Sequence, residues 1–271
     1  MSAAANDNAN PGAVRNWRRA GVTLAQIALA AVLLAAWKWA AERFGETYVA
    51  DPVEVITRIA EIAGNGELWK HTYATLRLST IGFAIGCAGG VVLPFILRRL
   101  PRLTAAIEPY IMASVGVPKY ALIPLFILWF GINDAPKLWL VGLLVFYPVF
   151  IAVFAGIRNV DGRLLNMARI AGASENMIAR TVIWRSLQPF FFSSLKIALP
   201  RAISAAIIGE FLVGDEGIGF YIENARQSVD STGVFTGIVI ATILVLLINA
   251  VLEFVDRRAN AWRPRDRAMQ I

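Results

Sequence analysis

The sequence is poor in the side chains that carry most redox, metal and nucleophilic chemistry: its 271 residues include one cysteine and one histidine. Cys87 has no second thiol to pair with, so no disulfide framework is possible within the chain. His71 has no Cys or His partner at the spacing of a metal site. The phosphate-binding pattern Gly-x-x-x-x-Gly-Lys-Ser/Thr is also absent, and the glycine cluster at 214–219 contains no lysine. We therefore expect no catalytic, metal or cofactor site in this chain.

Charged residues are scarce too, at 17% of the chain, whereas 57% of the residues are hydrophobic. A soluble domain is about 45–50% apolar, so this composition favours a lipid bilayer as the solvent. A membrane helix needs about 20 mainly apolar residues. Six stretches meet or approach that length: 22–40, 76–97, 107–130, 138–157, 190–213 and 234–255. We predict an all-α membrane protein with about six transmembrane helices.

The third stretch is interrupted by Pro109, Gly116, Pro118 and Pro124. Such breaks free backbone groups that lipid cannot satisfy, so they occur where protein or a water-filled cavity surrounds them. The pattern therefore predicts a broken helix that lies inside a bundle rather than against lipid.

The two ends of the chain are polar and basic, which predicts a disordered basic tail over 1–19, a transmembrane domain over 20–257 and a second basic tail over 258–271. A charged start before an apolar run also describes a cleaved signal peptide. Trp37 and Trp39, which suit a membrane interface, favour an uncleaved anchor instead.

The basic residues indicate an orientation. With the amino terminus in the cytoplasm, 17 of the 26 Lys and Arg residues fall in inside segments and five in outside segments. Inside loops of membrane proteins carry this excess, which predicts that both termini are cytoplasmic. The same bias accounts for the net charge of +7, so we expect no nucleic-acid partner.

One outside segment, 51–66, has helix signals of its own. Asp51 suits an N-cap, Pro52 the first helical position, and the glycines around Asn65 a helix end. We expect a short amphipathic helix there, which acts as a packed connector or contacts solute.

A long inside loop, 158–189, connects the fourth and fifth stretches. Apolar residues recur at helical spacing on both sides of Gly172, which suits a helix end, and Ser174 suits the cap of a second helix. The pattern predicts a helix–Gly–helix elbow. Three interpretations follow: a DNA-binding helix-turn-helix, for which both membrane tethers leave little room; a structural cap; and a docking surface for another protein.

Residues 166–174 (Asn-Met-Ala-Arg-Ile-Ala-Gly-Ala-Ser) resemble the "EAA" loop of ABC importer permeases, whose pattern is Glu-Ala-Ala, three residues and Gly. The likeness extends over about 50–256. Pro118 and the segments 122–132, 146–157 and 195–222 resemble the nitrate, sulfonate and taurine branch of that family.

The resemblance implies a type I importer permease fold that functions as a dimer, with a second permease subunit, ABC ATPase subunits that hold ATP and Mg²⁺, and a periplasmic solute-binding protein as partners. It implies a multi-pass protein of the bacterial inner membrane that imports a small anionic solute. The alternative is a secondary transporter driven by an ion gradient, although no inverted repeat is visible.

In the family this loop is a coupling helix that docks on the ATPase, and the resemblance assigns docking to Asn166, Ala168, Gly172, Ala173, Ser174 and Arg185. Two positions depart from the family pattern. Asn166 replaces the usual Glu, and Arg185 stands in a Trp-Arg pair that replaces Leu-Pro. We expect docking to persist through shape and apolar contact around Ala168, Gly172 and Ala173, with an altered charge complement.

Three ionisable residues lie in predicted spans: Arg201, Glu210 and Lys119. A charge at mid-bilayer costs about 2.5–3.5 kcal/mol on insertion scales and needs a partner or water. Nine residues separate Arg201 from Glu210, two and a half helical turns, so they lie on opposite faces of a straight helix. These residues are candidates for the translocation pathway. Alternatively, Arg201 reaches the interface or bonds a broken backbone.

Overall fold

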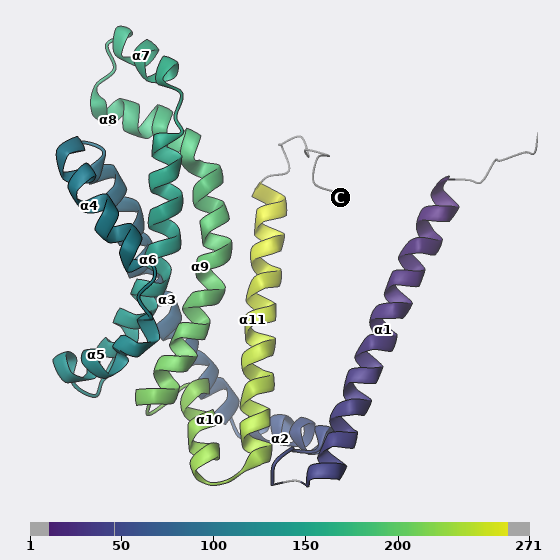
Figure 1. The fold of residues 1–271 in the computed structure, drawn as a ribbon. Coiled ribbons are helices and arrows are strands. Elements are labelled where there is room, and N and C mark those ends of the chain that lie inside the picture. The colour runs from purple at the N-terminus through teal and green to yellow at the C-terminus, as the bar shows by residue number, and fades with distance from the viewer. Residues whose placement is uncertain (1–10, 46, 260–271) are drawn as a thin grey trace, which may run out of the picture.

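A computed structural model describes residues 11–45 and 47–259, and this part of the chain contains helices and no strands. Figure 1 shows long helices side by side with short helices at both ends of the bundle. The long helices are α1 (Pro11–Phe44), α3 (Glu67–Leu97), α6 (Asp134–Arg158), α9 (Trp184–Val213) and α11 (Ser231–Ala259). The shorter elements are α2 (Pro52–Gly64), α4 (Pro101–Ser114), η1 (Lys119–Leu122), α5 (Ile123–Phe130), α7 (Gly162–Ile170), α8 (Glu175–Ile178), η2 (Ala179–Ile183) and α10 (Ile218–Gln227).

Five helical stretches are long and apolar enough to cross a membrane, or six if α4 and the η1–α5 segment count as one broken span. Five predicted stretches fall within the long helices, and the third, 107–130, covers parts of α4, η1 and α5 with the break between them, which confirms the predicted fold class. α3 begins at Glu67, well before its apolar part. The additional polar turns carry His71 and Thr75, which contact the start of α10.

The centre of the bundle is the contact between α3, α6 and α9. Gly82, Gly86 and Gly90 recur every four residues on α3 and face α6. A Cβ atom at Gly86 would lie 2.5 Å from the carbonyl oxygen of Gly142, so only glycine permits this approach. Small residues at this spacing let membrane helices pack backbone against backbone, where dispersion contacts hold them together. Val145 and Val149 of α6 are fully buried as a result.

The broken third span is confirmed as a break, with α4 and η1–α5 bent by 95°. The predicted location inside the bundle is wrong for α4 in the single chain, because α4 has no buried residue and lies at the edge. In α5, by contrast, Ile123 and Phe126 are buried. Lys119 explains how the break is tolerated there. Its Nζ donates to the carbonyl oxygens of Val115 and Val117 at 2.8 and 3.1 Å, so part of the freed backbone is satisfied locally.

The helix α1 stands apart from the bundle along most of its length (Figure 1), and its apolar window has no buried residue. Trp37 fixes the C-terminal part of α1 to the rest of the protein. Its Nε1 donates to the Ala50 carbonyl oxygen at 3.0 Å, and its ring stacks on that of Phe235 in α11. The helix begins at Pro11, within the predicted tail 1–19. The remainder of both predicted tails, 1–10 and 260–271, lies outside the described residues.

The connector helix α2 forms as predicted. Asp51 is its N-cap and accepts from the Val53 amide at 2.7 Å, and Pro52 opens the helix. Ile62 is buried in a cluster with Ile203, Ile218 and Ile240. This cluster ties α2 to α9, α10 and α11 at the end of the bundle opposite the elbow (Figure 1).

Candidate functional site

The elbow at one end of the bundle is formed by α7, a tight turn and α8. Asp161 caps α7 by accepting from the Arg163 amide at 2.8 Å. Gly172 has a φ of +78°, a left-handed conformation that favours glycine at a helix end. Ser174 caps α8 by accepting from the Met177 amide at 3.3 Å. The Gly172 turn and the Ser174 cap therefore stand where the sequence predicts them, and the Asp161 cap is a further feature of the structure.

The second elbow helix is not a separate element, which corrects the predicted pair of short helices. α8 passes through the π-helical turn η2 directly into α9 without an interruption. Ile178, Ile183 and Leu187 are buried along this run, and their packing against the bundle keeps the chain helical. The long loop is thus one free helix, α7, folded back on an extension of the fifth span.

The two faces of the elbow differ in character. Ala168 and Ala173, with Leu165, pack half-buried against the core of the bundle. The large apolar side chains on the outward face are instead Met167, which is 64% exposed, and Ile170, which is 89% exposed. Four other predicted docking residues are exposed: Asn166, Gly172, Ser174 and Arg185. The likeness drew attention to the small residues of the turn, and the outward apolar pair was missed.

Arginines at the end of α3 hold the elbow against the bundle. The Glu175 carboxylate accepts from Arg98 at 2.7 Å and, more weakly, from Arg169 at 3.4 Å. Arg99 donates to the Asn176 side-chain oxygen at 2.6 Å. Glu175 lies at the elbow, beyond the apolar part of α9, and its hydrogen bond with Arg98 lowers the pKa of its carboxyl. Ionised groups of opposite sign thus connect the elbow to α3.

A cavity of about 550 Å³ lies between α6, α9 and the end of α4. Tyr147 and Phe190 give its wall aromatic surface, and Ser193 and Ser194 add hydroxyl groups. Arg201 is exposed on the same wall. The cavity therefore places one cation beside apolar and hydroxyl groups, which is the composition that orients a small anionic molecule.

Lys119 lies close to this cavity but is already engaged. Its Nζ sits 4.3 Å from the centre of the Tyr147 ring, in addition to its bonds with backbone carbonyl groups at the helix break. Tyr147 in turn donates its hydroxyl to Ser114 Oγ at 2.8 Å. These contacts place Lys119 as a positioning residue that stabilises the bend, and a direct role in the pathway stays a prediction.

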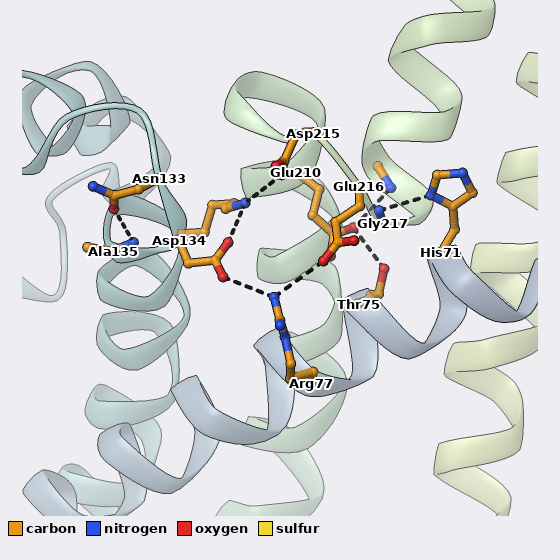
Figure 2. Close-up of polar contacts among 12 residues, drawn as sticks. His71, Thr75, Arg77, Asn133, Asp134, Ala135, Glu210, Asp215, Glu216 and Gly217 are labelled. Carbon is orange, nitrogen blue, oxygen red and sulfur yellow. Dashed lines mark hydrogen bonds and ion pairs between the residues drawn. The ribbon is translucent and has the colours of Figure 1, made fainter.

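Glu210 faces the opposite way from Arg201 and is 2% exposed. Its Oε2 accepts from Thr75 Oγ1 at 2.8 Å and from the Gly219 amide at 3.1 Å. Thr75 Oγ1 also accepts from the Ile218 amide, and His71 Nδ1 accepts from the Gly217 amide at 3.1 Å. Figure 2 shows these side chains converging on the first turn of α10. Glu210, a candidate for the pathway, thus joins α3, α9 and α10 inside the protein.

A second polar group lies beside this junction (Figure 2). Lys137 is 4% exposed and pairs with Asp134 at 2.7 Å. Arg77 pairs with Asp134 at 3.0 Å and with Glu216 at 3.3 Å. These bonds tie α3 and α6 to the loop between α9 and α10. No group of three or more His, Cys, Asp or Glu residues in the described part of the chain has the arrangement of a metal site.

Sequence reasoning missed the partners of Glu210. His71 and Thr75 precede the apolar part of α3, and Gly217–Gly219 follow α9, so more than 130 residues separate them. The one available signal was the pair of glycines around Ile218. A Cβ atom at Gly217 or Gly219 would collide with Glu210 or the α9 backbone, so the glycines mark the close approach.

The broken span, the small-residue helix contacts and the elbow define a polytopic membrane protein with a surface suited to a second protein. The family described as "Binding-protein-dependent transport system inner membrane component" matches residues 81–261. The chain belongs to this family of permease components of ABC importers. The helix α1 lies outside the matched region.

Relatives and solved structures agree with this family. The chain is 27% identical to the formylaminopyrimidine transport permease protein ThiX of Halalkalibacterium halodurans, over 86% of this chain and 94% of ThiX. It is 28% identical to the putative aliphatic sulfonates transport permease protein SsuC of Bacillus subtilis, over 87% and 86%. It shares its fold with the inward-facing MetNI methionine ABC transporter, with a TM-score of 0.55 and 20% identity over 71% of this chain and 94% of that chain.

Proposed function

We propose that this permease conducts a small anionic solute, and that Arg201 contacts the solute during its passage. The exposed guanidinium of Arg201 on the wall of the cavity is the observation that carries the proposal. Charged residues within spans usually face a pathway or a partner. Arg201 fits this rule, whereas Glu210 is held inside the protein by Thr75 and Gly219.

The cavity favours a solute of modest size with an anionic group and an apolar body. Its volume of about 550 Å³ is in the range of small-molecule sites. The guanidinium provides a fork of donors for sulfonate, carboxylate or nitrate oxygens. The aliphatic sulfonates in the name of the SsuC relative have this chemistry.

The elbow end is the proposed cytoplasmic end, and both termini lie on that side. The positive bias of 17 residues against five supports this orientation. The exposed pair Met167 and Ile170 on α7 supports docking of an ATPase subunit there. ATP and Mg²⁺ are then bound by that subunit, and this chain has no ATPase site of its own.

A second copy of this chain is the proposed partner permease. The end of α4 and the helices α6 and α9 of a single chain line the cavity, and they do not enclose it completely. The exposed edge formed by α4 and α5 includes Leu128 and Trp129, which a second permease subunit would cover. A periplasmic solute-binding protein, implied by the family, delivers solute from the opposite end.

Uptake into proteoliposomes tests the solute class. The permease is reconstituted with its ATPase and binding protein, with an alkanesulfonate and a formylaminopyrimidine as probes. Arg201→Ala should lower sulfonate uptake by about tenfold, because a hydrogen bond to a charged group contributes about 1.5–3 kcal/mol. Arg201→Lys should retain part of the uptake, and Arg43→Ala, an exposed arginine of α1, should leave it unchanged.

Equal sulfonate uptake by Arg201→Ala and the wild type would exclude the proposed contact. ATP depletion separates the two energy sources. Uptake should stop without ATP, and uptake driven by an ion gradient in the absence of the ATPase would favour the secondary transporter instead.

A further inference from the structure

A hollow near the elbow lies apart from the cavity beside Arg201. It has a volume of about 670 Å³ and is lined by Phe95 at the end of α3 and by Asn176, Ala179, Arg180 and Trp184. Arg180 belongs to the π-helical turn η2. π-Helical turns are rare and frequently mark functional positions in helices. The hollow thus combines an irregular backbone, a cation and two aromatic rings.

The charge of Arg180 is not neutralised by the acidic group beside it. Glu175 is the nearest acidic residue in the sequence, and Arg98 and Arg169 already hold its carboxylate. Within the part of the chain that the structure describes, no carboxylate lies within ion-pair distance of the exposed Arg180 guanidinium. Arg99 adds a second cation next to the hollow through its bond to Asn176. The hollow is therefore electropositive and lacks an anion.

The walls of the hollow place it at the level of lipid headgroups. Phe95 is near the end of the apolar part of α3, and the arginines 98, 99 and 102 follow directly. Trp184 opens α9, and its ring lies 6.5 Å from that of Phe95 and 5.5 Å from that of Phe191. Tryptophan is enriched at the membrane–water interface because its ring is apolar and its N–H is polar. We therefore expect Phe95 and Trp184 to face lipid chains and the arginines to face lipid headgroups.

We propose that this hollow binds the headgroup of an anionic phospholipid. The phosphate accepts from Arg180, with Arg99 beside it, and the acyl chains lie along Phe95 and Trp184. Basic pockets between helices on the cytoplasmic side of membrane proteins bind anionic headgroups. The site rests on the proposed orientation, in which the elbow end is cytoplasmic. It is separate from the outward apolar pair Met167 and Ile170 of α7.

A bound lipid here would act on the segment that connects the elbow to the fifth span. η2 is the only link between α8 and α9, and Ile178 and Ile183 on either side of Arg180 are buried in the bundle. A headgroup on Arg180 therefore stabilises the π-helical turn in its present form. Anionic lipid is expected to support ATPase activity that depends on the permease.

Lipid retention measures the site directly. The assembled transporter is purified and mixed with phosphatidylglycerol or phosphatidylcholine, and bound lipid is counted by native mass spectrometry. The wild type should retain phosphatidylglycerol in preference to phosphatidylcholine. Arg180→Gln should lower phosphatidylglycerol affinity about fivefold, the contribution of one basic residue near an anionic lipid surface. Arg258→Gln, an exposed arginine at the end of α11, should retain wild-type affinity.

Equal phosphatidylglycerol affinity of Arg180→Gln and the wild type would overturn the proposal. So would displacement of the lipid by millimolar inorganic phosphate, which would indicate a site for a free anion. Phosphatidylglycerol bound to the permease without its ATPase but absent from the assembled transporter would also overturn it, because the hollow would then be a protein contact. Labelling of Met167→Cys in a Cys87→Ser background tests the orientation separately. Labelling from the periplasmic side would refute the proposed orientation while leaving the lipid measurement intact.

Discussion

The two ends of the α8–η2–α9 helix carry a glutamate each, and their surroundings are opposite. Glu175 at the elbow is exposed and pairs with Arg98, whose side chain is 14% exposed, and with Arg169 of α7. Glu210 near the other end is buried and bonded to a threonine of α3 and an amide of α10. An exposed ion pair contributes little because water competes for both charges. A buried carboxylate with fixed donors is costly to disturb, because a lost partner leaves a polar group unsatisfied.

This difference fits the proposed function, in which the elbow end engages and releases the ATPase subunit. The polar contacts of the elbow with α3 involve the exposed Glu175, and its outward residues Met167 and Ile170 are apolar. The other end is one unit, in which α3, α9 and α10 share a hydrogen-bond network (Figure 2). The continuous α8–η2–α9 helix connects the elbow directly to this junction.

Removal of the buried carboxylate should have the largest effect. Glu210→Ala leaves the Gly219 amide and the Thr75 hydroxyl without their acceptor and opens a cavity, which should destabilise the protein by about 2–5 kcal/mol. Thermal unfolding in detergent measures the loss. Glu210→Gln keeps an acceptor oxygen and should cost less.

Glu216→Ala is the matched control, since Glu216 is a partly exposed acid in the neighbouring loop. If Glu210→Ala and Glu216→Ala unfold at the same temperature, the two ends of the helix do not differ in the way described.

A charge on the outward face of the elbow should have the next largest effect, on association rather than on stability. Ile170→Asp places a carboxylate where an apolar contact is expected, and ATPase affinity should fall by about tenfold or more, the scale of an interface hot spot. Co-purification and titration of the ATPase with the detergent-solubilised permease measure the affinity.

The same change at the opposite end, Ile56→Asp, provides the control, because Ile56 is an exposed isoleucine of α2 and this helix lies far from the elbow in Figure 1. Unchanged ATPase affinity of Ile170→Asp would show that the docking surface lies elsewhere.

The exposed glutamate should have the smallest effect. The hydrogen bond from Arg98 lowers the folded-state pKa of Glu175, so the pair stabilises the protein above the ordinary pKa of a glutamate. This stabilisation is lost as the pH falls through the lowered value. Glu175→Gln should remove that part of the acid dependence and leave stability near neutral pH almost unchanged. Thermal unfolding as a function of pH measures both, and a large loss for Glu175→Gln at neutral pH would contradict the comparison.

Features that depend only on neighbouring residues were predicted correctly, and features that depend on packing between helices were not. The six apolar stretches, the cap at Asp51 and the turn at Gly172 are set by neighbouring residues, and the structure contains all three. The continuous run through η2 was missed, because burial of Ile178 and Ile183 against other helices decides it. The inward-facing Ala168 and the outward-facing Ile170 could not be told apart for the same reason.

The amino-acid sequence by itself determined the membrane class, the approximate spans, the elbow and the family, since hydrophobic length, capping residues and short motifs act within one helix or turn. Tertiary structure alone decided that α4 lies at an edge, that Lys119 stabilises its break, and that Arg201 and Glu210 have different surroundings. Glu210 finds its donors on α3 and α10, which only folding brings together. A charge in a span is visible in the sequence, but its partner is a property of packing.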